Sequence, residues 1–333
     1  MSVDLKEFLS YVAKRVDEYM LSKIVGEPSV LYQAARHYIV AGGKRLRPAI
    51  AIAVARMLGG SEEVAIPLAA SLEVLHTFTL IHDDIIDQDD VRRGVPTVHR
   101  VWGVGKAIVA GDLLHSFSYR AIVDAVERGL DPEHGLRAVK VLAEASIEIC
   151  EGQIMDMDFP TMERVSVDQY IEMVSKKTGA LFEASARMGA IAARAPQSVE
   201  ESIGRALRLA GIAFQIKDDI LGIVGDEKVL GKPVYSDLRE GKRTLPIIYA
   251  LNNVDEGSRR ELLRVLGNRN ATREDFERAK SIIVECGAID YSEKMARRYL
   301  DEALKIVESI DAREPSYRDL LKSLMTLMVE RRR

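Results

Sequence analysis

The sequence predicts an all-α protein, because helical spacing covers most of the chain, strand signals are weak, and prolines stand between the helical stretches. Apolar residues recur with a period close to 3.6 over long stretches. No alternating run bounded by hairpin turns stands out. The ten prolines lie mostly between these stretches or in their first turns. With 333 residues, of which 47% are apolar and 29% charged, the chain can bury a sizeable core.

Each predicted helix is identified by its own apolar spacing. The first, residues 5–21, is apolar at Leu5, Phe8, Leu9, Val12, Val16 and Met20. A later one, residues 273–286, also has a start signal, because Thr272 stands three residues before Asp275. Several stretches are apolar on most faces, so we expect some helices to be surrounded by others. In chain order the remaining stretches are 30–40, 49–58, 64–81, 106–126, 136–150, 167–193, 202–224, 245–253, 258–266, 289–310 and 317–332.

Composition argues against several classes of function. The net charge of −4 does not favour a nucleic-acid partner. Cys150 and Cys286 lie far apart without metal-ligand spacing, so we expect a reduced, cytoplasmic environment. The N-terminal stretch is charged and amphipathic, unlike a signal peptide. The most apolar stretch noted, residues 49–60, is interrupted by Arg56 and is too short to span a bilayer.

Residues 80–94, LIHDDIIDQDDVRRG, place five aspartates within eight positions at the end of an apolar helical stretch. Asp83 and Asp87 are four residues apart, so they lie on one face of a helix. Like charges at this spacing weaken a helix by roughly 0.2–0.5 kcal/mol per pair. Two such carboxylates suit Mg²⁺, which takes oxygen ligands and keeps phosphate oxygens as well. A solvated helix end is the alternative interpretation of this cluster alone.

A second acidic pair favours the metal site. Asp218 and Asp219 stand on another apolar helical stretch, in AFQIKDDILG. Two helices that each carry Asp-Asp-Ile suggest carboxylates that face one another across a cavity and hold metal ions. Such metals would in turn hold a diphosphate.

Basic residues could bind the phosphates of such a substrate. In AGGKRLRP, Lys44, Arg45 and Arg47 follow two glycines at the expected start of a helix, where an anion is favoured. A loop with solvated charges is the alternative. In SKKTGALF, Gly179 costs roughly 1 kcal/mol relative to Ala in a helix, which indicates a kink or a close approach. The other candidates are Arg92 and Arg93 after the first acidic cluster, Lys177 and Thr178 beside Gly179, and Lys232 and Lys242 in GKPVYSDLREGK, which lacks P-loop spacing.

Together these motifs resemble those of the trans-type isoprenyl (polyprenyl) diphosphate synthases. GGKRLRP, DDIID, the following RRG, KTGAL, FQIKDD and GKPVYSDLREGK stand in the family's order and at its spacings, and His76 and EGQIMDMDF agree. The resemblance covers the chain as a single polyprenyl synthetase domain, residues 1–333. It implies the isoprenoid synthase fold, with helices around a central catalytic cavity, usually as a homodimer or higher homo-oligomer. It also implies Mg²⁺-dependent head-to-tail condensation of isopentenyl diphosphate with an allylic (dimethylallyl, geranyl or farnesyl) diphosphate.

The resemblance further implies a role for each candidate residue. The ionising allylic C–O bond needs cations where charge grows on the diphosphate, and the carbocation needs an apolar wall. Metal ligands would be Asp83, Asp87 and Asp218, supported by Asp84 and Asp219. The allylic diphosphate would contact Arg92, Lys177 and Lys232, and isopentenyl diphosphate would contact Lys44, Arg47, His76 and Arg93. Thr178 and Gln215 would steady the allylic cation, and Lys242 would favour the leaving group.

Two features bear on activity and product length. The family's second acidic motif often ends in a third aspartate, whereas Gly222 stands there in this sequence; we expect full activity nevertheless. Phe78 resembles the bulky floor that limits chain growth, about 7 Å from Asp83 along the helix axis. With the small Thr79, and with His115 lining the same tunnel, this pattern resembles an archaeal-type geranylgeranyl diphosphate synthase with a C20 product. A farnesyl (C15) or longer product stays open, as does plain core packing of Phe78.

Three other classes of protein are compared with this one. A class I terpene cyclase would share the fold and the first acidic motif, but it would not need GGKRLRP and Arg93. A helical di-iron protein would need two Glu-x-x-His motifs, and only Glu73 to His76 supplies one. A non-catalytic partner subunit would have lost acidic residues, whereas both Asp-Asp pairs are present.

Overall fold

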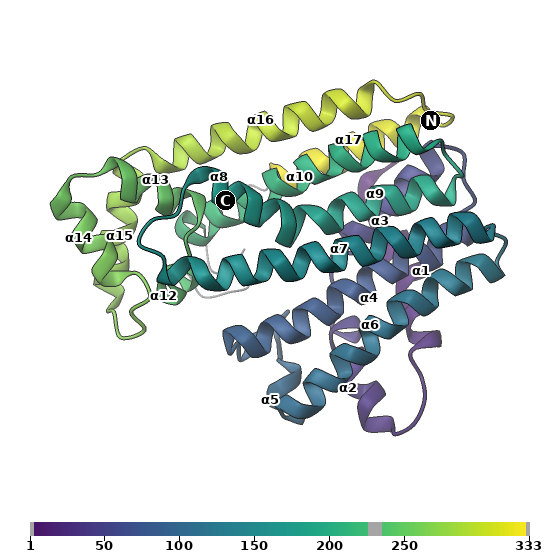
Figure 1. Cartoon of the computed structure of the whole chain (residues 1–333), viewed down its shortest axis with the longest axis horizontal. Helices are drawn as coiled ribbons and strands as arrows, with labels where there is room; N and C mark the ends of the chain where they lie inside the picture. Colours follow the sequence, from purple (N-terminus) through teal and green to yellow (C-terminus); the bar gives the residue numbers. More distant parts are fainter. Residues whose placement is uncertain (1–2, 226–234, 331–333) are drawn as a thin grey trace. The chain divides into compact units, whose positions relative to one another are not determined.

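The computed structural model describes residues 3–225 and 235–330, which are helical over most of their length (Figure 1). The chain forms two compact units. Unit 1 consists of Met1–Ser146, Leu181–Arg205 and Ile306–Leu324, and unit 2 of Ile147–Ala180, Ala206–Lys305 and Met325–Arg333. The predicted all-α class is confirmed, whereas the single domain over residues 1–333 stays a prediction.

Unit 1 contains the N-terminal helices and the predicted first acidic cluster. The Asp4 side chain caps the first helix by accepting a hydrogen bond from the Glu7 amide at 2.8 Å. The helices are α1 (Leu5–Lys23), α2 (Ser29–Val40), α3 (Leu46–Met57), α4 (Glu62–Asp87), α5 (Val98–Trp102) and α6 (Val104–Glu127).

The core of unit 1 forms around α3 and α4. Every residue of α3 from Pro48 to Ala55 is buried, as expected for a helix that is apolar on most faces. Helix α4 packs along α6 and against α3 (Figure 1). By length and composition α4 could cross a membrane, but 78% of its apolar window is buried inside the protein. It is therefore a core helix.

Among the helices that the structure describes, four contribute residues to both units, and a fifth begins with the last residue of a unit 2 segment. The chain passes between the units within α7 (Pro132–Asp158), α10 (Gln197–Val224), α16 (Ala288–Glu308) and α17 (Pro315–Val329). Helix α9 (Ala180–Ala192) otherwise belongs to unit 1.

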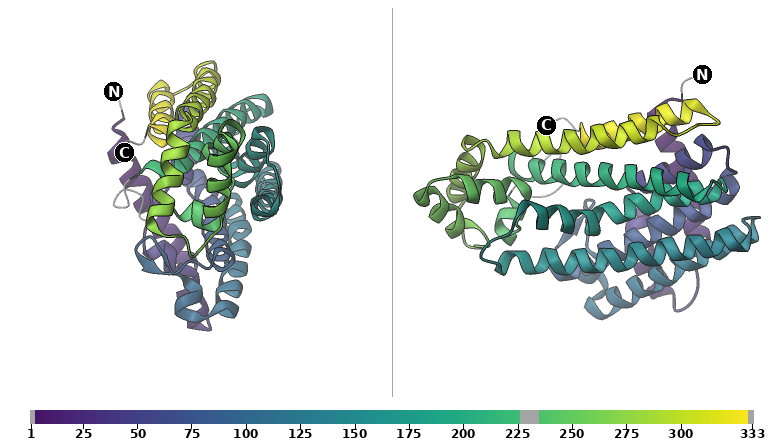
Figure 2. Two further views of the ribbon diagram at one scale, coloured as in Figure 1. Left: turned by 90° about the vertical axis from the view of Figure 1, so that its left-hand side faces the viewer. Right: turned by 45° about the horizontal axis from the view of Figure 1, so that its top comes forward.

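Unit 2 contains the second acidic pair and a group of short helices. Helices α13, α14 and α15 pack on one another, and Figure 2 shows them as the green cluster. The predicted start of α15 is confirmed, because Thr272 and Asp275 form a reciprocal capping box. The elements are η1 (Phe159–Thr161), α8 (Val167–Val174), η2 (Ser175–Gly179), α12 (Ser236–Glu240), α13 (Leu245–Asn253), α14 (Glu256–Val265) and α15 (Arg273–Glu285).

Three local features differ from the sequence-based expectation. Strands β1 (Val91–Arg92) and β2 (Val95–Pro96) form a small antiparallel hairpin, and α5 and α12 are five-residue helices. All of these are too short to produce a periodic pattern. The stretch 167–193, expected as one helix, is divided by the π-helical turn η2.

Candidate active site

The last turns of α4 hold two kinds of aspartate. Asp83 and Asp87 are half-buried and one helical turn apart, so both carboxylates remain within reach of a ligand. Asp84 is fully buried and accepts hydrogen bonds from the Tyr38 hydroxyl and from Arg92 Nε. Burial raises the pKa of Tyr38, and its bond to Asp84 raises it further. Tyr38 and Arg92 therefore offset the charge of Asp84 inside the protein.

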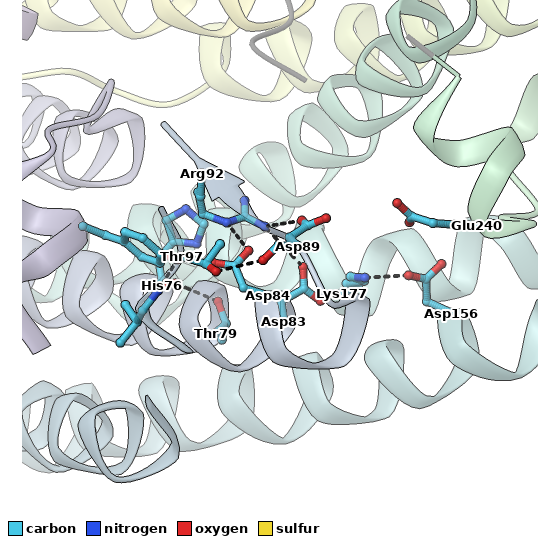
Figure 3. Close-up of polar contacts among 12 residues, drawn as sticks. His76, Thr79, Asp83, Asp84, Asp89, Arg92, Thr97, Asp156, Lys177 and Glu240 are labelled. Carbon is cyan, nitrogen blue, oxygen red and sulfur yellow. Dashed lines mark hydrogen bonds and ion pairs between the residues drawn. The ribbon is translucent and has the colours of Figure 1, made fainter. Parts of the chain in front are cut away.

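Arg92 lies beside this acidic cluster (Figure 3). Besides its bond to Asp84, its Nη2 lies 3.5 Å from Asp89 Oδ2 and 4.0 Å from Asp83 Oδ2. The guanidinium is thus held at the edge of the predicted metal site, where it could also meet a phosphate oxygen.

Arg93 points to a different neighbourhood because it sits in the two-residue turn of the hairpin. Arg93 and Gly94 both have positive φ, +53° and +77°, as such a turn requires. Arg93 Nη1 donates to the carbonyls of Tyr38, at 3.1 Å, and Gly42. This brings the RRG motif against the GGKRLRP motif, as the predicted isopentenyl diphosphate site requires.

His76 is the centre of this second basic region. Burial, followed by the charges of Arg47 and Arg93, lowers the pKa of His76 well below its usual value, so the imidazole is neutral at neutral pH. Arg47 lies over the Phe182 ring, 4.7 Å from its centroid, and burial lowers its pKa to about 10. Its Nε is buried and has no hydrogen-bond partner among the residues that the structure describes. A bound anion would supply that partner and offset the clustered charge.

Two residues near His76 have structural roles instead. Arg45 is buried; its Nε donates to Asp17 at 2.6 Å and its Nη1 to Glu73 at 2.9 Å. The expectation that Arg45 binds an anion together with Lys44 and Arg47 is wrong, because its side chain is fully buried and its Nη2 also donates to the Ile39 carbonyl at 2.9 Å. Glu73, which begins the Glu-x-x-His motif of the di-iron alternative, is the acceptor of the hydrogen bond from Arg45 Nη1. Lys44 is exposed in the turn before α3.

In unit 2 a chain of hydrogen bonds connects three predicted site residues. Thr178 Oγ1 donates to Gln215 Oε1 at 2.9 Å, and Gln215 Nε2 donates to Asp219 Oδ1 at 2.9 Å. Tyr170 donates to the other oxygen of Asp219 at 2.6 Å. Burial, and then the charge of Asp237, raises the pKa of Asp219 to about 8. Asp219 therefore orients Gln215 and Thr178, while Asp218 beside it is exposed and accessible to a ligand.

Asp156 joins the two predicted lysines of unit 2. Its Oδ2 accepts a hydrogen bond from Lys177 Nζ at 2.6 Å and lies 4.0 Å from Lys242 Nζ. Figure 3 shows the contact between Asp156 and Lys177. Lys242 also lies 3.1 Å from Glu240. Asp156 belongs to the motif EGQIMDMDF, which agrees with the family's pattern but does not by itself indicate a role for this aspartate.

The glycine of the second acidic motif has a spatial explanation. A Cβ on residue 222 would lie 2.7 Å from Asp237 Oδ2, so the carboxylate of Asp237 stands where a third aspartate of that motif would begin. No spacing within the motif points to Asp237, because this residue belongs to α12. Lys232 lies outside the described residues.

The predicted chain-length residues meet between α4 and α6. The centroid of the Phe78 ring lies 4.7 Å from that of His82 and 5.2 Å from that of His115. The ring centroids of His115 and Tyr119 are 5.3 Å apart. Phe78 is only half-buried, which differs from an ordinary core phenylalanine. The Thr79 hydroxyl donates to the His76 carbonyl at 2.8 Å within the same helix.

The accessible carboxylates fit Mg²⁺ when substrate phosphates supply some of its ligands. Among residues 3–225 and 235–330, no group of three or more His, Cys, Asp or Glu side chains is close enough together to hold a metal ion. Mg²⁺ is commonly held by one or two carboxylates together with waters and substrate phosphates, rather than by an all-protein cage. Asp83 with Asp87 in unit 1, and Asp218 in unit 2, are accessible donors of that kind.

Known proteins resemble this chain over most of its length. A family model described as polyprenyl synthetase matches residues 28–283. Geranylfarnesyl diphosphate synthase of Aeropyrum pernix is 50% identical over 318 residues, covering 95% of this chain and 99% of that protein. The crystal structure of geranylgeranyl pyrophosphate synthetase from Pyrococcus horikoshii is similar, with a TM-score of 0.90, 39% identity, and coverage of 98% and 99%. Geranylgeranyl pyrophosphate synthase from Corynebacterium glutamicum, complexed with isoprenyl diphosphate and magnesium, has a TM-score of 0.88, 28% identity, and coverage of 99% and 100%.

Proposed function

Because this chain belongs to the polyprenyl synthetase family and is an isoprenyl diphosphate synthase, we propose that its main product is all-trans geranylgeranyl diphosphate (C20). One observation carries the choice of product. Phe78, five residues before Asp83 on α4, forms a ring contact with His115 of α6 and is not fully buried. Such a ring can stop a growing apolar tail that extends along α4 away from the carboxylates. The similarity to the Pyrococcus horikoshii structure supports the same product.

A geranylfarnesyl (C25) product is the second candidate. The Aeropyrum pernix relative, at 50% identity, is named for that product. The two candidates share the chemistry of each condensation and differ only in where elongation stops.

The residues of unit 1 would bind both substrates. Asp83 and Asp87 would hold Mg²⁺ with the allylic diphosphate, and Arg92 would contact the same diphosphate from its position beside them. Lys44, Arg47 and Arg93 would bind isopentenyl diphosphate near the neutral His76. When bound, Mg²⁺ would neutralise charge on the departing diphosphate.

The residues of unit 2 would support ionisation of the allylic substrate. Asp218 would supply a further metal ligand, with Asp219 in support, and Lys177 and Lys242 would favour the negative charge of the leaving group. Lys232 is proposed for the same substrate on its motif alone. Thr178 and Gln215, ordered by Asp219 and Tyr170, would direct oxygen dipoles toward the carbocation.

We also propose that the chain acts as a cytoplasmic homodimer. Helix α6 exposes several large apolar side chains, which a second copy of the chain would cover. Sedimentation of the purified protein would measure its mass, and a monomer at working concentration would contradict this part. The exposed apolar side chains of α6 are Val104, Ile108, Val109 and Val123.

One assay of product formation tests the proposal. The protein is incubated with isopentenyl diphosphate, Mg²⁺ and, in turn, dimethylallyl, geranyl or farnesyl diphosphate, with a chelator as control. The products are dephosphorylated and separated by chromatography. We expect metal-dependent elongation that ends at C20. Accumulation of C25 would favour the second candidate, and absence of elongation with all three primers would overturn the proposed substrates.

A further inference from the structure

The π-helical turn η2 (Ser175–Gly179) carries Lys177 and Thr178. The Ala180 amide donates to the Ser175 carbonyl, five residues back, so the turn holds one residue more than an α-helical turn. Such turns are rare and occur frequently at functional sites. The extra residue changes the direction in which the side chains of the turn project, relative to α8. The positions of Lys177 and Thr178 therefore depend on what keeps this turn in place.

Arg208 of α10 is bonded to both α7 and η2. Its Nη1 and Nη2 donate to the two carboxylate oxygens of Glu148, at 2.7 and 3.0 Å, in a bidentate pair. The same Nη1 lies 3.3 Å from the Ser175 carbonyl oxygen and 3.2 Å from Ser175 Oγ. Paired charges with this fork geometry are among the stronger and more directional contacts in proteins. Arg208 thus holds the first residue of the turn against α7.

The aliphatic part of Arg208 contacts the other end of the turn. A Cβ on Gly179 would lie 3.2 Å from Arg208 Cγ and 3.4 Å from its carbonyl oxygen, which is tighter than an ordinary contact. Arg208 therefore covers η2 from Ser175 to Gly179. This explains Gly179, for which the sequence indicated a kink or a close approach, since the close approach is present.

Helix α7 also packs closely against the middle of the turn. A Cβ on Gly152 would lie 2.4 Å from the Lys177 backbone nitrogen and 2.8 Å from its Cα, so only glycine fits there without a shift. The turn is accordingly held on two sides, by the backbone of α7 and by the Arg208 side chain. Lys177 reaches Asp156 and Thr178 reaches Gln215 from this fixed position.

We infer that Arg208, acting through Glu148 and Ser175, is a positioning residue that sets Lys177 and Thr178 for the prenyl-transfer reaction. Arg208 touches neither substrate in this inference; it acts through the turn. The inference rests on the proposed roles of Lys177 and Thr178.

Steady-state kinetics of Arg208→Gln, beside a matched control, test this inference. The control is Arg187→Gln in unit 1, because Arg187 is similarly buried, 19% exposed against 23%, and pairs with Glu200 at 3.0 Å. We expect Arg208→Gln to lower kcat by about 100-fold, since a misplacement of about 1 Å can have that effect, while KM for isopentenyl diphosphate stays unchanged. Arg187→Gln should lower Tm and leave both constants unchanged. Arg208→Lys keeps the charge but not the fork, so it should restore only part of kcat.

The outcomes separate this inference from the proposed function. Lys177→Met is measured in parallel, and wild-type turnover of that variant would contradict the role of Lys177 itself. A defective Lys177→Met together with an Arg208→Gln that behaves like the Arg187→Gln control would overturn the positioning role alone. If Arg208→Gln does not fold, Glu148→Gln replaces it, because it removes the negative charge that holds the Arg208 guanidinium and keeps the size of the side chain. A folded Glu148→Gln with unchanged kcat would then refute the inference.

Discussion

Replacement of Phe78 by Ser should lengthen the product from C20 toward C25. Phe78 lies five residues before Asp83, or about 7 Å along the axis of α4 at 1.5 Å per residue. The next α4 side chain on the same face is Val74, four residues and so about 6 Å further on. Removing the ring would therefore allow the tail to extend by a length comparable with one isoprene unit. Primer ionisation should survive, because the change is a full turn away from the carboxylates.

The stability of this variant distinguishes a floor from core packing. A fully buried phenylalanine cut to a small residue costs roughly 3–5 kcal/mol. Phe78 is only half-buried, and its ring contacts with His82 and His115 are each worth about 0.5–1.5 kcal/mol. We therefore expect a smaller loss, roughly 1–3 kcal/mol, together with the longer product.

Chromatography of the dephosphorylated products and a thermal melting curve make the test. Thr79→Phe is the matched opposite change, since an aromatic ring one position closer to Asp83 should shorten the product toward C15. An unaltered C20 product from a strongly destabilised Phe78→Ser would show that the ring is ordinary core. The C20 assignment would then lose its main support, although the prenyl-transfer chemistry would not.

Three further predictions concern the carboxylates, the backbone of α7 and His76. Asp83→Ala and Asp218→Ala should each abolish turnover at saturating Mg²⁺ while Tm stays unchanged or rises slightly, since like-charge repulsion is relieved; near wild-type turnover of either would contradict the metal assignment. Gly152→Ala should destabilise the protein by roughly 1–3 kcal/mol and lower kcat, because its Cβ would lie 2.4 Å from the Lys177 nitrogen, and an unchanged kcat would refute that link. The pKa of His76 is lowered, mainly by burial, so below pH 6.5 the unfolded chain takes up a proton that the folded protein refuses. Stability should therefore fall with decreasing pH by about 1.4 kcal/mol per unit for this group, and His76→Asn should remove that contribution in urea unfolding at pH 5 and 7; equal slopes would show that His76 is not the cause.

Local sequence patterns determined most of the helices and the identity of the accessible carboxylates. Apolar spacing alone predicted α4 and α10, because the period of a helix is set by backbone geometry over a few residues. The four-residue spacing of Asp83 and Asp87 placed them on one face for the same reason. Turns of two residues leave no such pattern, so the hairpin around Arg93 was missed.

Only the tertiary structure decided which neighbouring residues have which role. Arg45 and Arg47 stand in one motif, yet Arg45 is bonded to Asp17 and Glu73 while the Arg47 Nε is buried without a hydrogen-bond partner among the described residues. Asp156 joins Lys177 and Lys242 across 86 positions of sequence, from 156 to 242, and no spacing rule reaches that far.

The contacts of Arg208 with η2 are likewise decided by the tertiary structure. Gly179 indicated a kink or a close approach, but the partner comes from another helix, and only packing brings the two together. Backbone geometry determines how residues of one helix face, whereas the partner of a buried charge is chosen by contacts between segments that are distant in the chain.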